Sequence, residues 1–233
     1  MRIFVTAALS VAVLVLAASV SMAQGRGGRG MAPPEGPMLL LNKSVQDELK
    51  LTDDQKADLK KIQEKMTEAM GTAFKEHKDD KDALTKAMKE VTDDTTKSAT
   101  KIADSLKDDQ KKRFKQIEIQ VKGIRAFTDE DVGKTLKLTD KQKDEAKTVS
   151  EDLTKDTREI MQDARGDRTK MEEARKKVTE LTVKATETIV SKLSDDQKKT
   201  WKDITGDKFD YKPEFGGFGP GKGGKDKKGD KSF

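Results

Sequence analysis

The stretch "LTDDQKADLKKI", residues Leu51 to Ile62, decides the fold, because three close copies of it follow along the chain. These copies are "LKDDQKKRFKQI" from Leu106, "LTDKQKDEAKTV" from Leu138 and "LSDDQKKTWKDI" from Leu193. The first and third copies begin 87 residues apart, and so do the second and fourth. An internal repeat of this length indicates two structural units in tandem.

Apolar residues keep the same spacing outside the repeated phrase. A shift of 87 residues superposes Val45/Val132, Leu49/Leu136, Leu51/Leu138, Val91/Val178, Ile102/Ile189, Leu106/Leu193 and Ile117/Ile204. Apolar residues also recur in steps of three and four, and no proline occurs between Met38 and Lys212. Such a pattern predicts long amphipathic helices of the coiled-coil kind. We therefore predict an all-α fold with two tandem four-helix units, residues 39–125 and 126–206.

Each phrase reads as the start of a helix. The Thr52 hydroxyl can accept a hydrogen bond from the backbone three residues on, while Gln55 reaches back to the Thr52 N–H, which forms a capping box. The following acids suit the positive end of the helix dipole. At the second phrase Lys107 cannot accept such a bond, and Asp108 is predicted to replace it. The predicted motif and capping residues are Leu51, Thr52, Gln55, Leu106, Asp108, Gln110, Leu138, Thr139, Gln142, Leu193, Ser194 and Gln197.

The two ends of the chain differ in composition from its centre. Residues 1–23 form an apolar run with Arg2 before it and small residues at its end, which predicts a cleaved signal peptide; an uncleaved anchor is the alternative. Residues 24–38 read as a Gly/Arg/Pro-rich linker, and residues 207–233 as a disordered Gly/Lys/Phe-rich tail. We expect an exported protein, periplasmic or extracellular, with no membrane span after cleavage. The tail either adds solubility or docks on a partner or a polyanion.

Composition argues against catalysis and against a metal. The chain has no Cys and a single His, and its acids are spread along helical surfaces. His77 lies in a charged turn and is expected to be solvated. The acidic pairs Asp79/Asp80 and Asp93/Asp94 lack the spacing of an EF-hand loop. We predict no enzymatic activity, no cofactor and no small-molecule substrate.

Charge is abundant but balanced in the central region. The chain has 48 Lys and Arg against 43 Asp and Glu, and most of the excess lies in residues 1–38 and 207–233. A nucleic-acid-binding domain concentrates Lys and Arg on one face, so nucleic acid is not an expected partner.

Two "LTxxQ" phrases per unit behind an export signal resemble the Spy/CpxP family of periplasmic proteins. The matching residues are Leu51, Thr52, Gln55, Leu106 and Gln110, then Leu138, Thr139, Gln142, Leu193, Ser194 and Gln197. The resemblance covers residues 39–206. It implies an antiparallel helical cradle that acts as an ATP-independent chaperone or in envelope-stress signalling; related members sense metals. Family members form homodimers, so the duplication predicts a monomer whose two units pack as a pseudo-dimer, unless they pair between chains. The nearly neutral central region departs from the basic cradle of the family's chaperones.

The candidate client-binding residues are Met66, Met70, Phe74 and Met88, which form an adaptable apolar set of the kind found on promiscuous surfaces. Plain core packing is the other interpretation. The sequence thus leaves two hypotheses. One is an exported chaperone-like or envelope-stress accessory protein that binds unfolded or envelope proteins. The other is a structural protein of the cell envelope whose helices act as a spacer and whose basic tail tethers it.

Overall fold

The computed structural model describes residues 34–212, and within this range every regular element is helical. The predicted all-α fold is confirmed. The predicted signal peptide, the linker up to residue 33 and the tail from residue 213 lie outside the described residues.

The elements of the two halves start at the same spacing as the repeated phrases. The first half comprises η1 (Gly36–Leu41), α1 (Lys43–Glu48), α2 (Asp53–His77), α3 (Lys81–Asp104) and α4 (Asp108–Lys122). The second half comprises η2 (Gly123–Thr128), α5 (Glu130–Thr135), α6 (Asp140–Asp163), α7 (Arg168–Ser191) and α8 (Asp195–Thr205). Each element of the first half begins 87 residues before its counterpart in the second.

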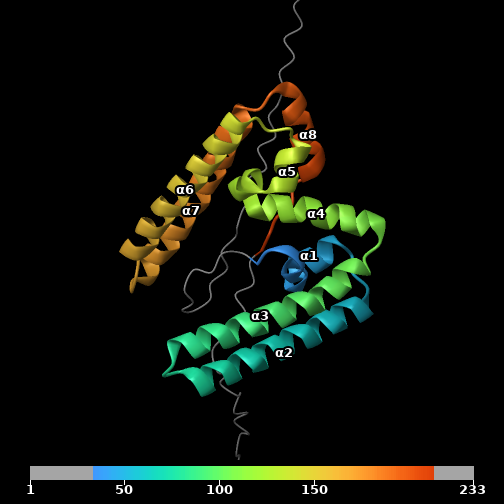
Figure 1. Cartoon of the computed structure of the whole chain (residues 1–233), viewed down its shortest axis with the longest axis vertical. Coiled ribbons are helices and arrows are strands. Elements are labelled where there is room, and N and C mark those ends of the chain that lie inside the picture. Colours follow the sequence, from blue (N-terminus) through green and yellow to red (C-terminus); the bar gives the residue numbers. More distant parts are fainter. Residues whose placement is uncertain (1–33, 213–233) are drawn as a thin grey trace, which may run out of the picture.

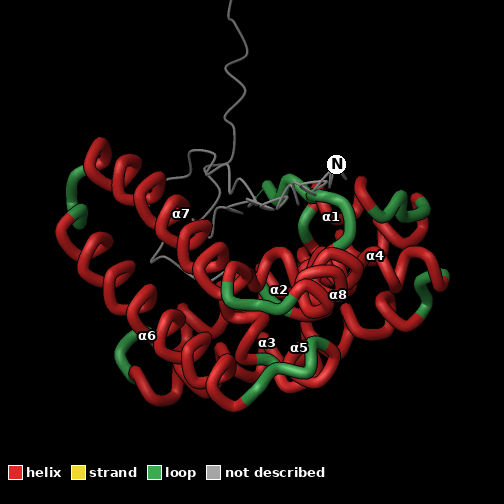
Figure 2. Tube along the Cα trace, turned by 90° about the horizontal axis from the view of Figure 1, so that it is seen from above, coloured by secondary structure: helices red, strands yellow, loops and turns green. Residues whose placement is uncertain are grey.

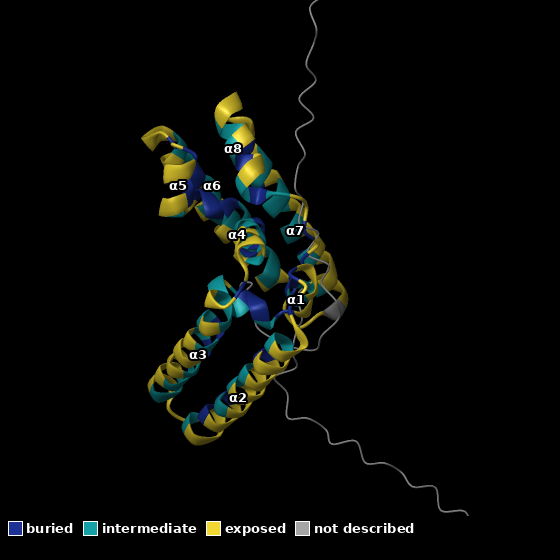
Figure 3. Cartoon of the chain, turned by 90° about the vertical axis from the view of Figure 1, so that its right-hand side faces the viewer, coloured by how far each residue is buried: buried dark blue, intermediate teal, exposed yellow. Residues whose placement is uncertain are grey.

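Two long hairpins extend from a central group of shorter helices. Helices α2 and α3 form one hairpin and α6 and α7 form the other; α1 and α4 lie between them, and α5 and α8 lie beside the base of the α6–α7 hairpin (Figure 1). The tips of both hairpins lie on the same side of the molecule (Figures 1 and 2). Each hairpin buries side chains along the seam between its helices and exposes the outer surfaces (Figure 3).

Two hydrophobic cores hold the central helices to the bases of the hairpins. The first core contains Leu39, Leu40, Val45, Leu49, Leu51, Leu59, Leu106, Phe114 and Ile117, together with Phe209 and Tyr211. The second contains Ile124, Ala126, Phe127, Val132, Leu136, Leu138, Ala146, Ala185, Ile189, Val190, Leu193 and Trp201. Several members lie 87 residues apart, among them Leu40 and Phe127, and Phe114 and Trp201. In the second core Phe127 stacks on Trp201 with ring centroids 4.3 Å apart.

Helix α4 joins the two halves. Its Val121 packs against the first core and its Ile119 against the second. It also lies against α8, where Gln116 Nε2 donates to the Asp203 carbonyl at 3.1 Å. Just beyond α8, Gly206 has φ +62° and lies so close to α4 that a Cβ there would collide with the Gln116 side chain. A side chain at this position would displace the Gln116 amide, and the positive φ also favours glycine.

The passage between the halves is a short turn. Helix α4 ends at Lys122, because Gly123 takes φ +55° and starts the 3-10 helix η2. Asp129 is the N-cap of α5, and its carboxylate accepts from the Asp131 N–H at 3.1 Å.

The predicted linker and tail also contain ordered residues. The last residues of the predicted linker, from Gly36, belong to η1. Glu35 Oε1 forms an ion pair with Arg125 Nη1 at 2.6 Å. The tail was predicted to be disordered from residue 207, but Phe209 and Tyr211 are buried in the first core. The prediction failed because it treated these aromatics as part of the polar tail, although they alternate with charged residues as in a segment with one buried face.

Candidate functional site

The repeated phrases lie in pairs where helices begin. Thr52, Thr139 and Ser194 are the N-caps of α2, α6 and α8, and each forms the capping box with the glutamine three residues on. In the first of these, the Gln55 N–H donates to Thr52 Oγ1 at 3.2 Å and Gln55 Oε1 accepts from the Thr52 N–H at 3.0 Å. All four copies therefore start a helix, and three of them form the complete capping box.

The copy at α4 caps its helix differently. Lys107 is the N-cap, and its N–H donates to Gln110 Oε1 at 3.0 Å. An ammonium group cannot accept a bond, so the other half of the box is missing. Asp108 was predicted to replace it, but Asp108 lies inside the helix as its first residue and contributes charge to the first turn.

The leucine that opens each phrase is a core residue. Leu51 and Leu106 are buried in the first core, and Leu138 and Leu193 in the second. Each half therefore brings its two phrases to the same hydrophobic core, where the helix starts are fixed relative to each other.

In the second half the glutamines of the two phrases bind each other. Gln142 Nε2 donates to Gln197 Oε1 at 2.9 Å, and Gln197 Nε2 donates to Gln142 Oε1 at 3.0 Å. Each amide nitrogen also contacts a backbone carbonyl next to the other phrase, that of Lys192 or Lys137, at 3.2 Å. Each glutamine thus holds its own helix start through its oxygen and the partner phrase through its nitrogen. In the first half, Gln110 Nε2 instead donates to the Leu49 carbonyl at 2.8 Å.

The candidate client-binding residues do not form one open face. Met70 is buried in the seam of the α2–α3 hairpin, and Met66 and Met88 are half-buried. For Met70 the burial agrees with the core-packing interpretation. Phe74, in contrast, is 53% exposed and is the one large hydrophobic side chain classed as exposed among residues 34–212.

The buried side chains between the two helices of each hairpin are mostly small. Buried positions along these seams are occupied mainly by small residues: Ala73, Thr95, Ala99, Ala146, Ala164, Ala174 and Ala185. Each small side chain buries little apolar area, so half-buried larger residues such as Met66, Met88 and Leu153 supply further packing in the hairpins.

Other polar groups have structural partners. Asp80 caps α3, accepting from the Ala83 N–H at 2.9 Å, and Asp93 pairs with Lys89 at 2.6 Å. His77 is the last residue of α2 and is half-buried. Within residues 34–212 no group of three or more His, Asp and Glu side chains converges as a metal site would require. Across the same range no helix combines the length and the apolar content needed to cross a membrane.

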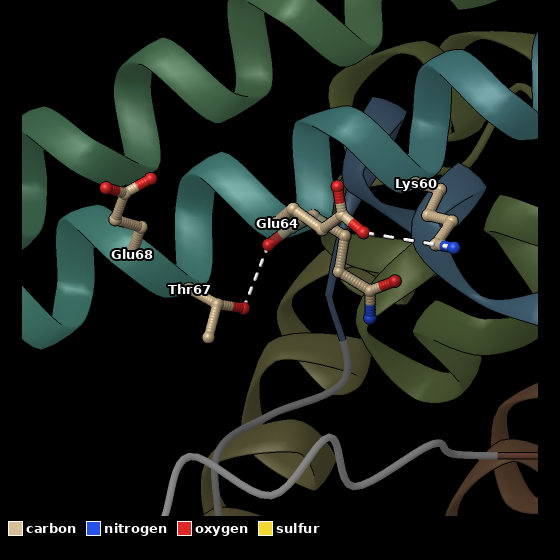
Figure 4. Close-up of a pocket in the computed structure, with 5 residues that line it drawn as sticks. Lys60, Glu64, Thr67 and Glu68 are labelled. Atoms are coloured by element: carbon tan, nitrogen blue, oxygen red, sulfur yellow. Dashed lines mark hydrogen bonds and ion pairs between the residues drawn. The ribbon is translucent and has the colours of Figure 1, made fainter. Parts of the chain in front are cut away.

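A shallow depression on the outer face of α2 does not form an enclosed site. It is lined by Lys60, Gln63, Glu64, Thr67 and Glu68, all from the same helix (Figure 4). Lys60 Nζ lies 3.9 Å from Glu64 Oε1, and the Thr67 hydroxyl donates to the Gln63 carbonyl at 2.9 Å. No second element supplies a converging group, so this surface has no evident chemistry.

The junction between the halves carries perturbed ionisable groups. Lys122 Nζ lies 2.6 Å from Asp129 Oδ2, and this hydrogen-bonded pair lowers the pKa of Asp129 and raises the pKa of Lys122. Burial on α4 raises the pKa of Glu118, against the effect of Lys122 and Lys115. The pair stabilises the turn into the second half, whereas the Glu118 charge is poorly solvated.

Sequence reasoning missed a group of residues that bind the segment after α8. Asn42, Ser44, Arg113 and Gln120 form hydrogen bonds to this segment, and its own Phe209 and Tyr211 are buried. Gln120 was the detectable signal, because it is a polar residue on the apolar face of α4. The alternation of aromatic and charged residues at 208–212 was the second.

No family model, no curated protein and no solved structure matches this chain significantly.

Proposed function

We propose that the chain is an exported, ATP-independent binding protein that holds unfolded or partner proteins, in the manner of the Spy/CpxP-like family that its phrases resemble. The α2–α3 hairpin carries the proposed binding surface. The observation that supports this most is Phe74, a large aromatic side chain that is 53% exposed near the tip of the hairpin. Exposing this much apolar area to water is unfavourable, and a partner that covers it would gain the corresponding free energy.

The surroundings of Phe74 suit weak and adaptable binding. Met66 and Met88 are half-buried on the same hairpin, and methionine side chains adjust to irregular surfaces. Lys75 and Glu76 are exposed beside Phe74, so charge surrounds the apolar group and would keep a complex soluble.

The second hairpin provides a natural comparison. At the positions 87 residues after Phe74, Met70 and Met88 it carries Met161, Thr157 and Arg175, and Met161 is half-buried. The α6–α7 hairpin is thus less apolar and less exposed where α2–α3 offers Phe74. We therefore place client binding on the first hairpin only.

Suppression of aggregation tests the proposal. The mature chain should slow aggregation of a destabilised substrate at near-stoichiometric ratios without ATP. Phe74→Ser should reduce this effect several-fold at unchanged helicity, and the matched control Met161→Ser should leave it intact. Met70 is left unchanged, because a serine there would disrupt the seam rather than the surface.

The alternative, a spacer tethered by its basic tail, predicts a different result. A spacer would not suppress aggregation, and it would bind anionic polymers through residues 213–233. The tail is deleted after Lys212 rather than after Gly206, because Phe209 and Tyr211 belong to the first core. Binding to polymers that is lost with this deletion, without any suppression by the intact chain, would favour the spacer.

A further inference from the structure

The segment that follows α8 lies against the first half of the molecule as an extended peptide. Phe209 and Tyr211 are 4% and 2% exposed, whereas Lys208, Asp210 and Lys212 between and beside them are exposed. The two aromatic rings are 6.4 Å apart and both join the first core, beside residues from η1, α1 and α4. Alternate side chains therefore point into the core and into solvent, as in a bound strand.

One end of this segment is held through its backbone by helix α4. Gln120, 8% exposed, uses both ends of its amide: Nε2 donates to the carbonyls of Thr205 and Asp207, and Oε1 accepts from the Phe209 N–H at 2.8 Å. Arg113 Nη1 donates to the same Asp207 carbonyl at 2.8 Å. Arg113 Nη2 lies 2.7 Å from Glu48 Oε1, and this ion pair positions the guanidinium group.

The other end is held by the start of α1. Asn42 Nδ2 donates to the Lys212 carbonyl at 2.7 Å, while the Lys212 N–H donates to Ser44 Oγ at 3.2 Å. Asn42 also caps α1 through its oxygen, so its amide orientation is fixed. An amide is required for both contacts, because a carboxylate could not donate to the carbonyl.

This arrangement is the one by which proteins bind extended peptides. Hydrogen bonds to the main chain provide affinity, and pockets for alternate side chains provide specificity. We propose that the surface formed by η1, α1 and α4 is a binding site for an extended peptide with two aromatic residues separated by one residue, and that residues 207–212 occupy it in cis. The site reads the backbone through Gln120, Arg113, Asn42 and Ser44, and it reads sequence only at the two aromatic positions.

The second half shows why the segment is a separable ligand. Ile124 is the residue 87 positions before Tyr211, and it enters the second core directly from the turn after α4, with α5 continuing the chain. Tyr211 reaches the first core from the other half of the molecule, after the last described helix. The first core is therefore completed by a segment that can leave without unfolding any helix.

A peptide titration tests this inference. The full mature chain carrying Phe209→Ser and Tyr211→Ser is titrated with a fluorescent peptide of residues 206–213, GDKFDYKP, by anisotropy. The variant should bind the peptide saturably at one site. The wild-type chain should bind at least tenfold more weakly, because its own segment competes at an effective concentration on the order of millimolar. The same peptide with serine at both aromatic positions should not bind.

Two outcomes would overturn the proposal: no binding by a variant that retains wild-type helicity, or equal binding by variant and wild type. If the variant loses helicity, the peptide should restore it and raise the unfolding midpoint saturably, since it binds only the folded state. Failure to do so would also overturn the proposal. The result is independent of client binding, because the site lies in the first core and not on the hairpin.

Discussion

Replacing Gln142 by Ala removes a local bond and a long-range bond together. Gln142 Oε1 accepts from the Thr139 N–H at 3.0 Å, which completes the capping box of α6. The same side chain exchanges two hydrogen bonds with Gln197, at 2.9 and 3.0 Å. Since a hydrogen bond contributes a net 0.5–1.5 kcal/mol, and less where it is exposed, we expect Gln142→Ala to lower the free energy of unfolding by about 1–2 kcal/mol.

The link between the two phrases appears as a coupling energy. Gln197→Ala should cost a similar amount, but the double variant should cost about 1 kcal/mol less than the sum, because the shared pair can be lost only once. The free energies come from urea unfolding followed by circular dichroism at 222 nm.

The first half supplies a matched control. Gln55 and Gln110 occupy the corresponding positions and form local bonds to their own N-cap residues. Gln110 reaches across to the Leu49 carbonyl rather than to Gln55. The cycle of Gln55→Ala with Gln110→Ala should therefore show coupling near zero. Coupling below about 0.3 kcal/mol for Gln142 with Gln197, or equal coupling in both halves, would refute the assigned role.

Four further substitutions test a helix cap, the contact between α4 and α8, and two ionisable groups at the junction between the halves. Thr52→Ala should cost about 1 kcal/mol for a lost N-cap bond, and Gly206→Ala at least that much, because φ +62° and the contact with α4 both disfavour a side chain. Asp129→Asn should cost about 1 kcal/mol at pH 7 by breaking the pair with Lys122. Because the pKa of Asp129 is lowered when folded, this difference should disappear as the pH falls below its ordinary 3.8. Burial raises the pKa of Glu118, so Glu118→Gln should stabilise the protein at pH 7, with the gain lost as the pH falls through the raised pKa toward 4.5. Thermal unfolding of each variant at several pH values measures all four changes in stability.

Local structure followed from the sequence wherever it depends on neighbouring residues. Capping boxes at Thr52, Thr139 and Ser194 involve residues three apart, so the phrase alone predicts them. The charged turn expected around His77 also agrees, since α2 ends at His77 and α3 begins at Lys81. Periodicity likewise fixed the helical class, because one apolar face per helix is required for packing.

Contacts between distant residues could not be read in the same way. Met70 and Phe74 lie four positions apart on one apolar face, yet one is buried and the other exposed, because α3 covers only part of that face. The alternation at residues 208–212 indicates that Tyr211 lies on a buried face, but the core that it joins depends on the path of the chain after α8. The glutamine pair Gln142–Gln197 depends on two helix starts meeting at one core, so a motif that predicts the cap does not predict the pair.

Photo-crosslinking at position 74 tests most directly whether the first hairpin binds unfolded protein. A chain of residues 24–233 that carries p-benzoylphenylalanine in place of Phe74 keeps an aromatic group at the proposed surface. The same residue in place of Met161 places the probe at the corresponding position of the second hairpin. Irradiation with an unfolded client should yield an adduct from position 74 that is several-fold more abundant than the adduct from position 161, and the folded client should yield little from either. Equal crosslinking from both positions, or none from position 74, would contradict the account.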